Sequence, residues 1–121
     1  MNIEQICEYC LSKKGTTEDF PFDEDTLVFK VLGKMFALTS LKSWERGEAA
    51  INLKADPDYS QELRAEYKSI RPGYHMSKKH WNTLYLHEGE LQPQFIKELI
   101  DHSYNMVVRG LSKKIQQTLK Q

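Results

Sequence analysis

The fold is marked most clearly by one stretch in the second half of the chain, Arg71-Pro72-Gly73-Tyr74-His75-Met76-Ser77-Lys78-Lys79-His80-Trp81-Asn82-Thr83. Pro72 lacks a backbone N–H and Gly73 is conformationally free, so this pair breaks any regular element that precedes it. Residues 81–86 are rich in side chains typical of strands, and we expect a further short extended piece at residues 74–76. The stretch therefore predicts a turn and a strand that carry three basic side chains and no carboxylate.

Before this stretch, the sequence predicts one helix and three strands. Apolar side chains recur at helical spacing in residues 3–11, with Asn2 as the N-cap and Gly15 as the stop. An acidic loop follows. Strand patterns then occur at three places, residues 27–32, 35–41 and 48–54. We expect a two-residue turn at Gly33-Lys34 after the first strand and a turn at residues 43–47 after the second.

Three more helices are predicted from their ends. Asp56-Pro57 and Gln92-Pro93 each place proline at the first helical position. Gly110 ends the second of these helices, and Ser112 caps a short helix that reaches residue 119. The order helix, three strands, helix, one or two strands, helix predicts an α+β fold with a two-layer antiparallel sheet. Its helices cover one face of the sheet and leave the other partly free.

Composition places the chain among ordinary globular domains. The 121 residues are 40% hydrophobic and 28% charged, which fits a single domain over residues 1–121. No apolar stretch is long enough to span a membrane, and the start lacks the pattern of a secretory signal. Two cysteines and no export signal predict a cytoplasmic protein. We expect a monomer.

The residues do not assemble into a recognisable catalytic or metal-binding motif. Cys7 and Cys10 form a C-x-x-C, but both lie on the apolar stripe of the first helix, and no second cysteine pair completes a zinc site. His75, His80 and His87 stand in a segment without carboxylates or thiolates. A nucleophile motif and a glycine-rich phosphate loop are also missing. We therefore expect a non-enzymatic protein with no cofactor and no metal.

Charge is distributed unevenly although the formal net charge is zero. Residues 26–44 and 68–87 contain basic side chains but no carboxylate, and aromatic side chains alternate with the basic ones. Lysine and arginine bind phosphates through counterion release, and exposed aromatic rings can stack on bases. Lysines on strand edges also prevent aggregation, and the aromatic residues can belong to a core. The residues alone leave both interpretations open.

Four pieces of the chain, in order, resemble the MmcQ/YjbR family. These are Phe20-Pro21-Phe22-Asp23, residues 29–37, residues 72–83 and Ser103-Tyr104. The resemblance implies an antiparallel sheet with helices, similar to the CyaY-like fold. It also implies DNA binding through a double wing, meaning two strand-turn-strand projections. One wing would be the hairpin at Gly33-Lys34, and the other would lie around residues 75–81.

The leading hypothesis is a DNA-binding protein whose two wings contact phosphates. The predicted DNA-binding residues are Lys30, Lys34, Arg71, His75, Lys78, Lys79 and Trp81. The alternative is a protein-interaction or chaperone-like module that uses the free sheet face, with Trp44 or Trp81 as an anchor. A third hypothesis, iron binding by analogy with the CyaY-like fold, would use the carboxylates of Glu4, Glu8, Glu18 and Asp19.

Overall fold

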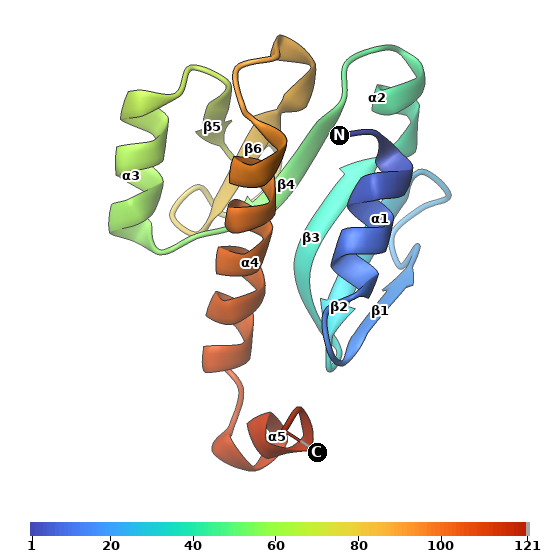
Figure 1. Ribbon diagram of the computed structural model, residues 1–121, viewed down its shortest axis with the longest axis vertical. Helices are drawn as coiled ribbons and strands as arrows, with labels where there is room; N and C mark the ends of the chain where they lie inside the picture. The colour runs from blue at the N-terminus through green and yellow to red at the C-terminus, as the bar shows by residue number, and fades with distance from the viewer. Residues whose placement is uncertain (121) are drawn as a thin grey trace.

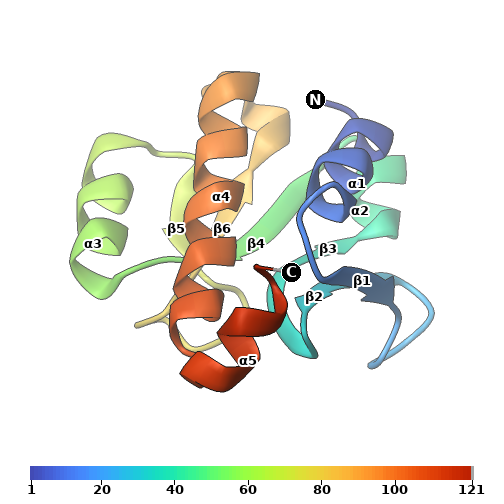
Figure 2. The same cartoon turned by 60° about the horizontal axis from the view of Figure 1, so that its bottom comes forward.

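A computed structural model describes residues 1–120 and shows one open sheet with helices packed on one of its faces (Figure 1). The sheet has six strands in the order β1-β2-β3-β4-β6-β5, and every pair of neighbours is antiparallel. Figures 1 and 2 both show α1 and α4 on the same side of the sheet. The predicted α+β class, the antiparallel sheet and the helices on one face are confirmed.

The N-terminal helix and the first strand pack side by side. Helix α1 (Ile3–Leu11) begins with a capping box, in which the Asn2 side chain accepts from the Gln5 N–H and the Gln5 side chain accepts from the Asn2 N–H. The helix buries Ile6 and Cys10. Strand β1 (Thr16–Asp19) corrects the expectation of an acidic loop directly after α1, because these residues pair with β2 as the edge strand of the sheet.

The first hairpin forms where it is predicted, but its turn lies one residue earlier. Strands β2 (Thr26–Val31) and β3 (Lys34–Ser40) enclose the turn residues Leu32 and Gly33. Both have positive φ, 48° and 86°, as a two-residue type I′ turn requires. The predicted turn at Gly33-Lys34 is therefore wrong by one position, because Leu32 accepts the left-handed conformation that leucine usually avoids.

The middle of the chain departs from the prediction at two places. Helix α2 (Leu41–Glu45) occupies most of the expected turn, and β4 (Ala50–Lys54) begins two residues later than predicted. After α3 (Pro57–Glu66), capped by Asp56, the next extended piece is β5 (Ile70–Pro72) rather than residues 74–76, which lie in a turn. Pro72 can occupy β5 because this strand lies at the sheet edge, where one side needs no N–H donor.

The C-terminal elements follow the prediction closely. Strand β6 (Trp81–Tyr85) leads through the 3-10 turn η1 (Leu86–Glu88) into α4 (Pro93–Arg109), and Ser112 caps α5 (Lys113–Thr118). Figure 2 shows α5 beside the C-terminal end of α4. Among the described residues, no helix is both long and apolar enough to cross a membrane.

The core lies between the sheet and its helices, with α4 as the central element. The buried Ser103 of α4 bridges β3 and β4 beyond the residues at which these two strands pair. Its Oγ donates to the Phe36 carbonyl at 2.5 Å and accepts from the Lys54 N–H at 2.8 Å. A register shift in the β2–β3 pair leaves Phe36 without a partner on β2, so this carbonyl needs a donor from outside the strand pair. Ser103 therefore joins the helix layer to the sheet.

Candidate binding surface

The sheet face opposite α1 and α4, called here the open face, carries its own small apolar cluster. Val28, Leu38 and Trp81 are buried there, one from each of three strands. Met35 packs against them, and so does Met76 from the loop between β5 and β6. That loop, residues 73–80, therefore folds back over the open face. It covers part of the face that the sequence predicts to be free.

Arg64 of α3 fixes the 73–80 loop from the side. Its Nε donates to Asn82 Oδ1 at 2.7 Å, and its guanidinium also donates to the carbonyl oxygens of Lys78 and Trp81. Gly73 closes the loop by donating to the Trp81 carbonyl at 2.8 Å. A Cβ on Gly73 would lie 2.9 Å from the Cβ of Trp81, so this close approach requires glycine.

Two of the predicted DNA-binding residues have carboxylate partners. Arg71 donates to both carboxylate oxygens of Glu88, at 3.0 and 2.8 Å, and its guanidinium lies 4.4 Å from the centre of the Tyr85 ring. Lys30 lies 3.6 Å from Asp19 on the neighbouring strand. Each of these cations therefore has a carboxylate neighbour that competes with a phosphate, whereas an unpaired lysine has none.

Three predicted lysines, Lys34, Lys78 and Lys79, are exposed, and within residues 1–120 no carboxylate lies in ion-pair distance of their ammonium groups. Lys34 lines a hollow of about 320 Å³ together with Lys54, Trp81 and the end of α4. Lys54 is not among the predicted site residues. The alternation of residues 48–54 nevertheless places its side chain on the face of the strand opposite Ile51 and Leu53, which could have marked it as accessible. We call this hollow the basic hollow. It lies where the two expected wings meet, because Lys34 belongs to the first wing and Trp81 to the second.

His75 and Trp81 occupy different environments. His75 is exposed, has a positive φ of 57°, and packs its ring against Tyr74 with 4.0 Å between ring centres. Trp81 is buried in the open-face cluster, so it supports the loop from beneath. Trp44 is also an unsuitable anchor, because it packs against the core and its Nε1 donates to Thr39 Oγ1 at 2.8 Å. The two tryptophans proposed as protein-binding anchors are therefore largely inaccessible.

The cysteines face the core side of α1. Cys10 is buried, and burial raises its pKa to about 12. Burial also raises the pKa of Cys7, helped by the charge of Glu18. Both thiols therefore stay protonated at neutral pH, which disfavours a nucleophilic or redox role. Within residues 1–120, no group of three or more histidine, cysteine, aspartate or glutamate side chains is placed to share a metal ion.

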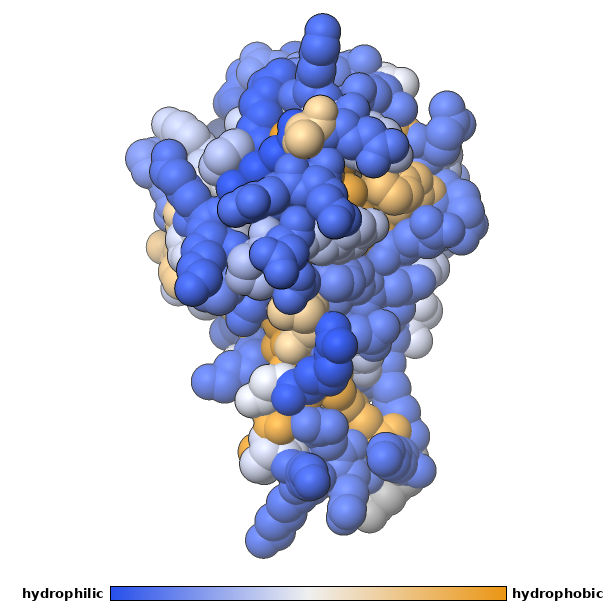
Figure 3. Space-filling view, turned by 90° about the vertical axis from the view of Figure 1, so that its left-hand side faces the viewer, coloured by the Kyte–Doolittle hydropathy of each residue, from blue (hydrophilic) through white to orange (hydrophobic). Residues whose placement is uncertain are grey.

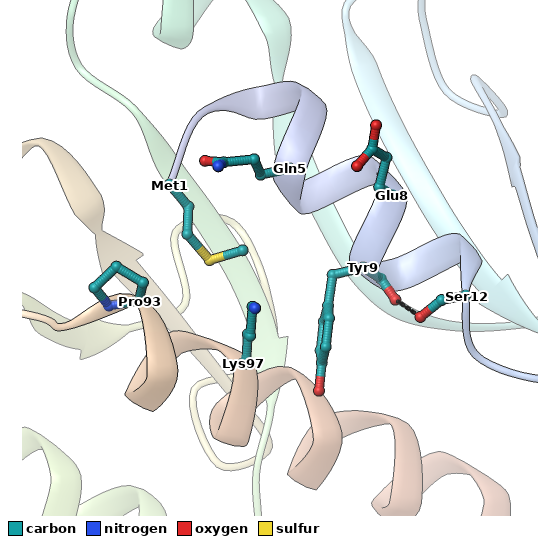
Figure 4. A pocket seen from close by; sticks show the side chains of 7 residues that line it. All are labelled: Met1, Gln5, Glu8, Tyr9, Ser12, Pro93 and Lys97. Carbon is teal, nitrogen blue, oxygen red and sulfur yellow. Dashed lines mark hydrogen bonds between the residues drawn. The ribbon is translucent and has the colours of Figure 1, made fainter.

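A separate cleft of about 450 Å³ lies between α1 and α4 (Figure 4). Tyr9 crosses it and donates its hydroxyl to Asp101 at 2.6 Å, and Lys13 pairs with the same carboxylate at 2.5 Å. Burial and Asp101 raise the pKa of Tyr9 to about 12. Lys97 lies 5.4 Å from the centre of the Tyr9 ring. These internal contacts satisfy the polar groups of Tyr9 and Asp101, so the cleft is a junction between helices.

Known proteins with similar sequences cover nearly all of the chain. A model of the YjbR family matches residues 11–106. The chain is 44% identical over 101 residues to the uncharacterized protein YbdF of Escherichia coli O157:H7, covering 84% of this chain and 80% of that protein. It is 32% identical over 121 residues to the uncharacterized protein YjbR of Escherichia coli strain K12, covering 100% of this chain and 99% of that protein.

Solved structures show the same arrangement. The crystal structure of protein DR2400 of Deinococcus radiodurans, with domain DUF419, superposes with a TM-score of 0.87 at 36% identity, covering 98% of this chain and 88% of that one. The crystal structure of a Pseudomonas syringae protein gives a TM-score of 0.73 at 32% identity, covering 88% of this chain and 98% of that one.

Proposed function

The chain belongs to the YjbR family, and we propose that it is a non-enzymatic DNA-binding protein that contacts phosphates at the basic hollow. The observation that carries the proposal is that Lys34 and Lys54 line one hollow without a carboxylate partner among residues 1–120. Lys78 and Lys79, on the loop that leads into β6, add two more exposed ammonium groups.

The wider charge distribution limits how DNA can approach. Seven of the 17 carboxylates lie in residues 1–25, while the net charge of the whole chain is zero. A duplex is therefore attracted to the basic hollow and repelled by the acidic N-terminal segment, which predicts weak binding that depends strongly on salt. Four phosphate contacts would give a slope of roughly −3 to −4 in a plot of log affinity against log salt. Contacts of this kind select no base sequence.

The test is a titration of the whole chain with a fluorescein-labelled duplex in low salt, followed by anisotropy. We expect saturable binding that Lys34→Glu with Lys54→Glu, which reverses both charges in the basic hollow, weakens at least tenfold. Arg46→Glu with Lys97→Glu makes the same charge change, and neither residue lines the basic hollow. This matched pair should weaken binding far less. Absence of binding in low salt, or an equal loss in both double variants, would refute the proposal.

A further inference from the structure

A second concave site lies on the open face, on the side of Met35 away from the basic hollow. This groove, called here the aromatic groove, has a volume of about 600 Å³ and runs between residues 20–25 and the 73–80 loop. Its floor includes Leu38 and Asn52, and its sides include Phe22 and Tyr74. Phe22 is 65% exposed and Tyr74 is 69% exposed, the two most exposed aromatic side chains among residues 1–120.

Such exposure is costly in water unless a ligand covers the rings. Burying an aromatic side chain of this size is favourable by roughly 2 kcal/mol or more, yet both rings pack outside the core clusters. By contrast, the side of the molecule that faces the viewer in Figure 3 is mostly hydrophilic, with small and separate apolar patches. Paired exposed aromatic rings around one groove are therefore a local feature that indicates a binding site.

Hydrogen bonds fix both sides of the groove. On one side, Asp23 accepts from the backbone N–H groups of Asp25 and Thr26 at 2.9 and 2.6 Å. On the other, the Tyr74 N–H donates to Thr83 Oγ1 at 3.1 Å. The backbone on both sides of the groove is thus tied by hydrogen bonds, which lowers the cost of ordering the site around a ligand.

The floor offers one polar group for orientation. Thr83 Oγ1 donates to Asn52 Oδ1, which fixes the side-chain amide of Asn52 in the groove. Its Nδ2 group donates to no partner among the described residues. A carbonyl oxygen of a bound chain can therefore accept from Asn52 while apolar side chains lie between the two rings.

Charge identifies the class of ligand. At Asp23 the groove continues into a hollow that is lined by four carboxylates against one lysine, namely Asp23, Glu24, Asp25, Glu45 and Lys42. Backbone hydrogen bonds lower the pKa of Asp23, and the Ser40 hydroxyl lowers that of Asp25, so both remain ionised at neutral pH. This end attracts cations and repels phosphates.

We propose that the aromatic groove binds an extended peptide segment of a partner protein, with an apolar side chain between Phe22 and Tyr74 and a lysine or arginine beside Asp23. Addition of a partner strand at a sheet edge is disfavoured, because β1 carries the charged Glu18 and Asp19 and β5 is short and ends in Pro72. The proposal does not rest on the DNA-binding proposal, which is argued from Lys34, Lys54, Lys78 and Lys79.

The test uses the whole chain and a fluorescein-labelled peptide with Leu-Lys-Leu-Lys at its centre. We expect saturable binding that Phe22→Ser or Tyr74→Ser weakens about tenfold, as expected for an aromatic anchor. Ile115→Ser is the control, because Ile115 is 44% exposed on α5 and lines no part of the groove. Asp23→Asn keeps an acceptor for the turn and should weaken binding less while reducing its salt dependence.

Two comparison peptides separate the alternatives. Ser-Lys-Ser-Lys should bind poorly because it has no apolar side chain, and Leu-Glu-Leu-Glu should bind poorly because Asp23 repels it. Equal binding of Leu-Lys-Leu-Lys and Ser-Lys-Ser-Lys would overturn the proposal, since charge alone would then explain the affinity. It would also be overturned if Phe22→Ser and Tyr74→Ser left peptide binding unchanged, or if they abolished binding of a single-stranded oligonucleotide instead.

Discussion

Replacing Arg64 by methionine should loosen the 73–80 loop while leaving the rest of the sheet folded. Methionine preserves much of the apolar stem of arginine but removes every donor. The buried Asn82 Oδ1 then loses its donor from Arg64 Nε, at 2.7 Å. A buried acceptor without a partner costs about 1–3 kcal/mol.

The other two acceptors add little to this cost. The Trp81 carbonyl still accepts from the Gly73 N–H at 2.8 Å, and the bond to the Lys78 carbonyl is exposed, so water can replace it. We therefore expect Arg64→Met to lower the free energy of unfolding by about 2 kcal/mol. Urea denaturation measures this change. Amide hydrogen exchange should also accelerate at Gly73 and Trp81, whose N–H groups close the loop.

Two controls make the expectation specific. Arg46→Met removes only exposed contacts, to Glu48 at 3.6 Å and to Ser43 at 3.3 Å, and should change stability by less than about 0.5 kcal/mol. In an Asn82→Ala background, Arg64→Met should cost at least about 1 kcal/mol less than in the natural chain. A cost below about 0.5 kcal/mol with unchanged exchange at Gly73 and Trp81 would show that Arg64 does not hold the loop.

Two further predictions concern α4. Ser103→Ala leaves the Phe36 carbonyl and the Lys54 N–H without their partner, so urea denaturation should show a loss of about 2–3 kcal/mol, and a loss below about 1 kcal/mol would contradict this role. His102 Nε2 accepts from the Asp56 N–H at 3.1 Å, and burial, with the nearby charge of Arg109, lowers the pKa of His102. Because the unfolded chain takes up the proton first, the stability contributed by His102 is complete above about pH 6.5 and is lost as the pH falls through the lower folded-state pKa. Thermal unfolding at pH 7.5 and at decreasing pH should show this loss in the natural chain and a smaller one in His102→Gln, whereas equal losses would contradict it.

The elements predicted correctly are those whose ends are set by local chemistry. Asn2, Asp56 and Ser112 cap their helices as expected, because a side-chain oxygen satisfies N–H groups only two or three residues away. Strand β1 gave no such signal. Three of its four residues are exposed, and it is a strand only because β2 pairs with it. Its formation depends on a contact between distant residues, which periodicity cannot reveal.

The same distinction applies to the candidate surfaces. The sequence located the two carboxylate-free segments, but it could not show that Arg71 meets Glu88, 17 residues away, or that Lys30 faces Asp19 across a strand pair. Lys54 was missed because it belongs to neither segment, and only the meeting of β3, β4 and α4 places it beside Lys34. Pairing across the sheet therefore decides which charges remain available to a ligand.

The 73–80 loop explains why a contiguous motif in the sequence contributes to two separate surfaces. Met76 attaches the loop to the apolar cluster at its middle, and Arg64 holds its far end. Tyr74, before Met76, lines the aromatic groove, while Lys78 follows it as an exposed basic side chain. Gly73 permits the tight closure that brings the loop ends together. Aromatic and basic side chains that alternate along the chain are thereby divided in space, so their alternation alone is no evidence for one nucleic-acid site.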